Sequence, residues 1–117
     1  MIGVADGVGG HAKREVCSGK CSKFLCRSFA ESNKTDPSKP LREVLTAGQK
    51  ALIDAKIDGS TTVVLARLDP ETRFQSVNMR TLNLGDSAYM IVRPEKDGGL
   101  DKVFRSEEQS HYFNCPF

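Results

Sequence analysis

The spacing of apolar residues changes near residue 58, and this change most constrains the fold. Before it, residues 12–30 and the segment from Pro40 to about Lys56 repeat apolar side chains at the 3.6-residue interval of half-buried helices. After it, β-branched and apolar residues cluster in short runs separated by turn residues, which is typical of strands. Helices followed by neighbouring strands favour an α+β domain whose helices pack on one face of an antiparallel sheet.

The strand that the sequence indicates most clearly is GSTTVVLARLD, residues 59–69. It is nearly all apolar from Val63 to Ala66, which predicts a central strand covered on both faces. The apolar lead before the first glycine cluster predicts a strand end at Ile2, Val4 and Ala5. Further strands are expected over residues 74–84, 88–92 and 102–104. The closing residues, 106–117, show no clear period.

The composition is that of an ordinary soluble globular protein, and it limits the classes of partner. The 117 residues are 38% hydrophobic and 27% charged, with a formal net charge of +2, so we expect a single domain over residues 1–117. This small positive excess does not indicate a nucleic-acid partner. No apolar run approaches the roughly 20 residues that a bilayer crossing needs, and no signal-peptide pattern opens the chain. We therefore expect no membrane span.

Two aspartates lie beside glycines at the ends of expected strands. Asp6 stands in VADGVGG, residues 4–10, and Asp86 stands in the Gly85-Asp86-Ser87 turn. If the strands pair as neighbours, the two carboxylates are expected to converge at one edge of the sheet, where they would repel unless a cation lay between them. Two structural alternatives remain open: Asp6 as the cap of the following helix, and Asp86 as part of a tight hairpin turn.

The chain has four cysteines, and three of them fall within the first expected helix: Cys17, Cys21 and Cys26. The favoured interpretation is that they are small buried side chains in a reducing compartment, because free cysteine is commonly buried. The alternative is a zinc site, although the spacings match no common zinc signature. Its further ligands would come from the fourth cysteine and the two histidines, Cys115, His11 and His111. For His11, a solvated side chain is favoured over an acid–base group.

Three stretches, taken in order, resemble motifs of a known enzyme family. ADGVGG at residues 5–10, GSTTVV at 59–64 and NLGDS at 83–87 are similar, in order and roughly in spacing, to motifs of the metal-dependent type 2C serine/threonine protein phosphatases. The closing SEEQSHYFNCPF is similar to a segment of the mitochondrial branch of that family, the relatives of the T-cell-activation phosphatase. The resemblance covers most of the chain and implies a pair of antiparallel sheets between helical layers, and a mitochondrial location.

The resemblance also implies hydrolysis of phosphoserine or phosphothreonine in a phosphoprotein substrate, at a site with two manganese or magnesium ions. By position, Asp6 matches the carboxylate that bridges both metals, and Gly7 matches the residue whose backbone carbonyl binds one of them. Asp86 matches an aspartate that in many members helps to bind a third metal. Oxygen ligands of this kind are those that both metals prefer. Two such ions activate a bridging water and stabilise the charge that develops on the phosphoryl oxygens.

Several family features are not found within these 117 residues. In the family, an acidic motif and a phosphate-binding arginine precede ADGVGG, and two further metal-binding aspartates follow near the carboxyl end. We therefore expect a partial type 2C fold, an antiparallel β-sandwich flanked by helices, with weak metal binding because few protein ligands are present. The functional alternative is a catalytically incomplete module that binds phosphoprotein or regulates a partner. The sequence leaves the oligomeric state open.

Two structural expectations follow from these departures. The segments SVNM (76–79) and TLNL (81–84) indicate an insertion before the Gly85 turn, which would shift the strand register and move Asp86 away from the metals. In a partial sandwich, the apolar faces of TTVVLA (61–66) and AYMIV (88–92) are expected to be partly uncovered.

Overall fold

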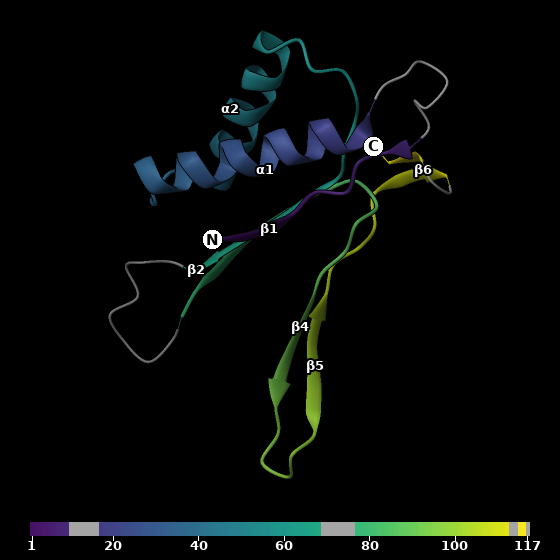
Figure 1. Cartoon of the computed structure of the whole chain (residues 1–117). Helices are drawn as coiled ribbons and strands as arrows, with labels where there is room; N and C mark the ends of the chain where they lie inside the picture. The colour runs from purple at the N-terminus through teal and green to yellow at the C-terminus, as the bar shows by residue number, and fades with distance from the viewer. Residues whose placement is uncertain (10–16, 69–76, 113–114, 117) are drawn as a thin grey trace.

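After a short first strand, both helices lie in the first half of the chain and the remaining strands follow them, as the change in apolar spacing predicts (Figure 1). The computed structural model describes residues 1–9, 17–68, 77–112 and 115–116. The start of the first expected helix, residues 12–16, and the expected strand start at 74–76 lie outside this range, as does His11. The elements are β1 (Ile2–Val4), α1 (Ser18–Thr35), α2 (Leu41–Asp54), β2 (Val63–Leu68), β3 (Met79–Leu84), β4 (Met90–Pro94), β5 (Leu100–Arg105), β6 (Ser110–Tyr112) and β7 (Cys115–Pro116).

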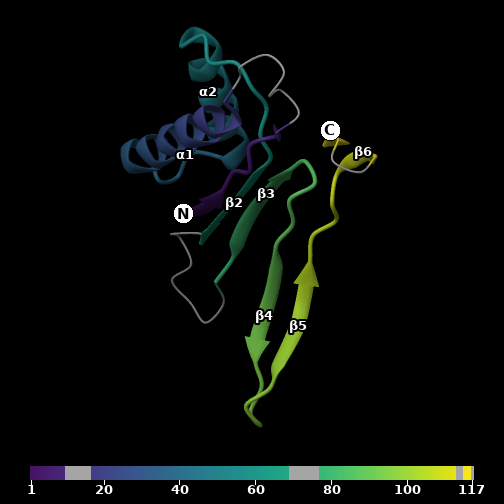
Figure 2. The same cartoon turned by 45° about the vertical axis from the view of Figure 1, so that its right-hand side comes forward.

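The central element is a three-stranded antiparallel sheet in the order β1-β2-β3, shown most clearly in Figure 2. The register of β2 against β3 runs without interruption from Leu68 opposite Met79 to Val63 opposite Leu84. No irregularity interrupts this pairing over the six residues of β3. The expected insertion relative to the family pattern stays a prediction. Strands β4 and β5 form a separate antiparallel pair, and β6 pairs with β7.

Both helices pack on one face of the three-stranded sheet and form the core there (Figure 1). Gly48 lets α2 approach α1 closely, since a Cβ at this position would lie only 2.6 Å from Cε1 of Phe29. The predicted apolar faces of the two helices are thus largely confirmed. The core side chains are Cys21, Leu25 and Phe29 from α1, Leu41, Val44 and Leu52 from α2, and Val63 and Leu65 from β2.

Strand β2 is central and buried, as predicted. Its side chains alternate, so that Val63 and Leu65 face the helices while Val64 lines a groove on the opposite side. The expectation that this strand is partly uncovered is wrong for Val63, Val64 and Leu65, which are buried, whereas Ala66 is half-buried and Leu68 is 63% exposed. Arg67, also buried, donates through Nη2 to the backbone carbonyl of Lys39 at 2.5 Å, which ties the loop between the helices to the sheet.

The cysteines differ in their surroundings, and only part of the expectation for them is confirmed. Cys21 is buried in the core, and this burial raises the pKa of its thiol. Cys17 and Cys26 are exposed, contrary to expectation. Cys17 lies just before the first turn of α1, and Cys26 lies five residues beyond Cys21, about 140° further round the helix.

The face of the sheet opposite the helices is an open apolar groove of about 570 Å³, between β1 and β2 on one side and residues 87–92 on the other. The β4–β5 hairpin projects away from the helices in both views (Figures 1 and 2). Ile2 is 76% exposed, and Met90 is exposed as well, so the expectation that AYMIV is partly uncovered is confirmed. The radius of gyration is 16.3 Å, against about 13 Å for a compact chain of this length.

We expect the isolated chain to self-associate through this groove, because large exposed apolar patches and free strand edges promote contact between copies. Analytical ultracentrifugation across a range of concentrations should show species larger than the monomer. Ile2→Lys should shift the population toward monomer, whereas Ile53→Lys, at an exposed position on α2, should not. A monodisperse monomer at every concentration would count against this expectation.

In the described part of the chain, no helix combines the length and apolarity needed to cross a bilayer.

Candidate functional site

The topology places Asp6 and Asp86 at the same end of the three-stranded sheet. Both β1 and β3 run antiparallel to β2, so both strands end where β2 begins. Val4, two residues before Asp6, pairs with Val64, and Leu84, two residues before Asp86, pairs with Val63. The fold therefore brings the two aspartate segments to the same end of the sheet, as predicted.

The backbone of Asp6 is held by the first residues of the β2 segment. Its carbonyl accepts from the amide of Thr62 at 2.9 Å and from the hydroxyl of Thr61 at 2.8 Å. Its amide donates to Oγ1 of Thr62 at 3.3 Å. The Asp6 side chain is exposed. The arrangement fixes the main chain of Asp6 and leaves its carboxylate at the surface.

Gly7 pairs with Thr61 in a single antiparallel β-bridge outside the named strands. The two hydrogen bonds of this bridge are formed by the residues that flank Gly7 and Thr61, not by these two residues themselves. On one side Asp6 accepts from Thr62, and on the other the amide of Val8 donates to the carbonyl of Ser60 at 2.9 Å. Among the described residues, the carbonyl of Gly7 accepts none of these backbone bonds. The sheet therefore leaves this carbonyl oxygen available as a metal ligand.

A hydroxyl pair joins the Asp6 segment to the Asp86 segment. Oγ1 of Thr62 lies 2.5 Å from Oγ of Ser87, and either oxygen can donate. Thr62 is only 3% exposed, whereas Ser87 is half-buried, so the pair is partly shielded from water. Thr62 therefore contacts both segments, the amide of Asp6 on one side and the neighbour of Asp86 on the other. Sequence reasoning gave Thr62 no role, although a threonine entering a buried apolar strand was the available signal.

The Gly85-Asp86-Ser87 turn connects two sheets. Gly85 is buried and has φ +93°, a conformation that favours glycine. The strands on either side, β3 and β4, belong to different sheets, so the alternative that Asp86 lies in a tight hairpin is wrong. The N-cap of α1 is Cys17, so Asp6 does not cap this helix.

The donor types at this end of the sheet fit manganese or magnesium, which bind oxygen ligands. They are the exposed carboxylate of Asp6, the carbonyl of Gly7 and the half-buried Asp86. Their number does not complete a coordination shell. Among the side chains that the structure describes, no three His, Cys, Asp or Glu gather to hold a metal ion. The zinc alternative stays a prediction, because His11 and the side chain of Cys115 lie outside this description.

Comparison with known proteins gives similarity along the whole chain. No family model matches it. The chain is 38% identical to the protein phosphatase PTC7 homolog of Danio rerio, covering 100% of this chain and 38% of that protein. The corresponding protein of Homo sapiens is 36% identical, with 100% and 37% covered, and that of Xenopus laevis is 35% identical, with 100% and 38% covered. The chain thus spans little more than a third of the length of these relatives.

A solved structure shares the fold. The X-ray structure of the photosystem II phosphatase PBCP superposes with a TM-score of 0.66 at 26% identity, covering 97% of this chain and 40% of that one. The expected α+β architecture with antiparallel sheets and flanking helices is confirmed by this match. Over the length that it spans, the chain is thus similar in sequence to protein phosphatases named PTC7 homologs and in fold to the phosphatase PBCP.

Proposed function

We propose that residues 1–117 form part of a metal-dependent protein serine/threonine phosphatase domain and contribute Asp6, Gly7 and Asp86 to its metal site. The observation that carries the proposal is the convergence of the Asp6 and Asp86 segments on the buried hydroxyl of Thr62. Similarity to the PTC7-homolog phosphatases and to the phosphatase PBCP supports the reaction class. The substrate would be a protein that carries phosphoserine or phosphothreonine.

The residues of this chain would act by holding and orienting the metals. The carboxylate of Asp6 and the carbonyl of Gly7 would bind manganese or magnesium, and Asp86 would bind a further ion. When bound, such ions lower the pKa of a water molecule and offset the charge on phosphoryl oxygens. The hydroxyls of Thr61 and Thr62 would keep the Asp6 backbone in place during turnover, because they hold its carbonyl and amide.

A second candidate function is a module that binds phosphoprotein or regulates a partner without hydrolysis. The observation that favours it is the absence, among the described residues, of any group of three metal-binding side chains. Weak metal binding would leave too little activated water for catalysis. The similarity of the closing segment to the mitochondrial branch supports a mitochondrial location for either form, which imaging of the tagged chain would test.

The distinguishing experiment measures hydrolysis of a phosphothreonine peptide by the folded chain as manganese is titrated. We expect Asp6→Asn to lower manganese-dependent hydrolysis by about 100-fold or more, since even residues outside the first coordination shell change metal affinity by about 10–100-fold. The matched control is Asp54→Asn, at an exposed position at the end of α2. Equal activity in Asp6→Asn and in the parent would contradict the proposed site, and a folded parent without activity would favour the binding module.

A further inference from the structure

The segment Ser106–Gln109 binds the connection between β3 and β4 at three points; we refer to it as the strap. It follows β5 directly and precedes β6. Sequence reasoning found no period in this region and gave it no structural role. Because the strap lies about 20 residues beyond the Gly85 turn in sequence, its contacts are tertiary.

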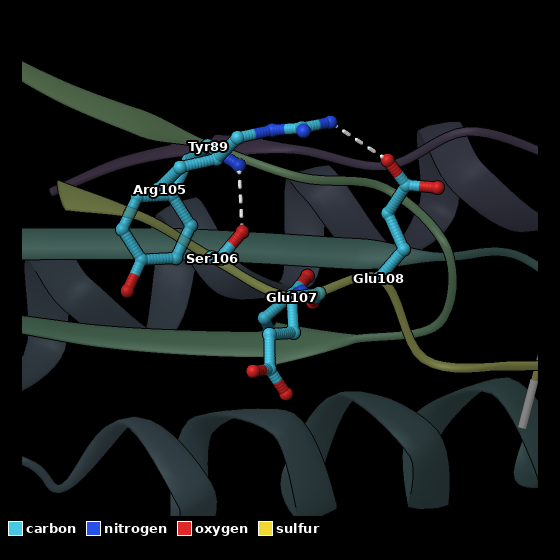
Figure 3. Close-up of polar contacts among 6 residues, drawn as sticks. Tyr89, Arg105, Ser106, Glu107 and Glu108 are labelled. Atoms are coloured by element: carbon cyan, nitrogen blue, oxygen red, sulfur yellow. Dashed lines mark hydrogen bonds and ion pairs between the residues drawn. The ribbon is translucent and has the colours of Figure 1, made fainter. Parts of the chain in front are cut away.

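The first and last contacts hold the two ends of the connection. Before the turn, Nδ2 of Asn83 donates to the carbonyl of Glu107 at 3.1 Å. After the turn, the amide of Tyr89 donates to Oγ of Ser106 at 2.9 Å, as Figure 3 shows, and the amide of Ser106 donates to the carbonyl of Tyr89 at 3.0 Å.

The middle contact lies at Gly85 itself. The amide of Gln109 donates to the Gly85 carbonyl at 2.9 Å, and the Gly85 amide donates to Oε1 of Gln109 at 3.4 Å. One residue therefore binds both backbone groups of a buried glycine whose φ is positive. A buried amide or carbonyl needs such a partner, because leaving it unpaired destabilises the conformation.

These contacts fix the residues on both sides of Asp86. Gly85 is held by Gln109, and Ser87 is held through its hydroxyl by Thr62 at 2.5 Å. The main chain of Asp86 is thus fixed on each side, although its own side chain takes no part. A metal ligand needs such support, since groups outside the first coordination shell orient the ligands and tune metal affinity.

We propose that Gln109 is a positioning residue for Asp86, which acts by holding both backbone groups of Gly85. The part of this inference that concerns metal binding rests on the proposed function, and the part that concerns the turn does not. Gln109 is not a catalytic residue in this assignment, because it contacts the main chain of the turn alone among the described contacts.

The strap also supplies its own control. Arg105 and Glu108 form an ion pair at 2.9 Å with both side chains more than half exposed (Figure 3). Exposed pairs of this kind contribute little to stability. Glu108→Gln therefore changes the strap beside Gln109 without touching the Gly85 contacts.

The test compares amide hydrogen exchange in the metal-free chain for the parent, Gln109→Ala, Gln109→Glu and Glu108→Gln. Gln109→Ala should accelerate exchange at Gly85 by about two- to tenfold, the effect of losing one hydrogen bond. Gln109→Glu keeps a side-chain oxygen acceptor and should stay near the parent rate, as should Glu108→Gln. Protection of the α2 amides reports whether each variant is folded.

A second measurement follows manganese binding by electron paramagnetic resonance. Gln109→Ala should raise the manganese concentration needed for half-saturation, and Gln109→Glu should restore it. Unchanged exchange at Gly85 in a folded Gln109→Ala chain would overturn the assignment, as would an equal effect of Glu108→Gln. Faster exchange with an unchanged manganese midpoint would overturn the link to the metal. Failure of the proposed function is seen separately, as hydrolysis or manganese binding that does not depend on Asp6.

Discussion

Replacing Thr62 with valine is expected to lower the free energy of unfolding by about 1–3 kcal/mol, the net loss of two hydrogen bonds of about 0.5–1.5 kcal/mol each. Valine has nearly the shape of threonine but lacks the hydroxyl, so the Asp6 amide and the Ser87 hydroxyl each lose a partner. Urea denaturation followed by circular dichroism would measure the change. If the proposed metal site is correct, manganese affinity should fall in parallel, because the two aspartate segments are no longer joined.

Thr62→Ser is the matched control for this substitution. Serine keeps the oxygen that bonds to Asp6 and Ser87 and removes only a methyl group, so it should retain most of the stability and of the manganese affinity. If valine and threonine give the same unfolding midpoint and the same manganese affinity, the hydroxyl pair at 2.5 Å does not hold the two segments together.

Replacing Leu65 with alanine is expected to destabilise the fold by about 2–5 kcal/mol, the range for removing a large buried aliphatic side chain. Leu65 is 1% exposed and lies in the core between the helices and β2. A loss of this size is a large fraction of the roughly 5–15 kcal/mol that stabilises a typical domain. The same urea titration would measure it.

Leu100→Ala provides the comparison, because Leu100 begins β5 and is 69% exposed. Surface substitutions usually change stability by less than about 0.5 kcal/mol. Equal effects at the two positions would mean that the helices do not pack on β2 as the structure has them.

Local patterns were enough to predict most of the elements. The 3.6-residue spacing predicted both helices, and the run from Val63 to Ala66 predicted the central strand. These patterns failed where exposure depends on the side of the helix that a residue faces, as at Cys26, or on a position before the first turn, as at Cys17. They failed also at the Gly85 turn, because a glycine-aspartate-serine sequence suits a hairpin as well as a connection between two sheets.

Some residues of the candidate site could be identified from the sequence, and others only from the structure. Asp6, Gly7 and Asp86 were identified from short motifs, and their assignment as metal ligands stays a prediction. Thr62 and Gln109 became apparent only in three dimensions, since their partners lie far away in the sequence. Asp6 and Thr62 are 56 residues apart, Thr62 and Ser87 are 25 apart, and Gly85 and Gln109 are 24 apart.

The sequence by itself determined the order of helices and strands, the apolar faces that form the core, and the motifs that resemble type 2C phosphatases. These depend on the periodicity and chemistry of neighbouring residues, which a single chain displays directly. Only the tertiary structure decided that β1 and β3 end together at the start of β2, and that Thr62 and Gln109 hold the segments of Asp6 and Asp86. The physical reason is that hydrogen bonds between distant segments depend on strand register and packing, which no local pattern encodes.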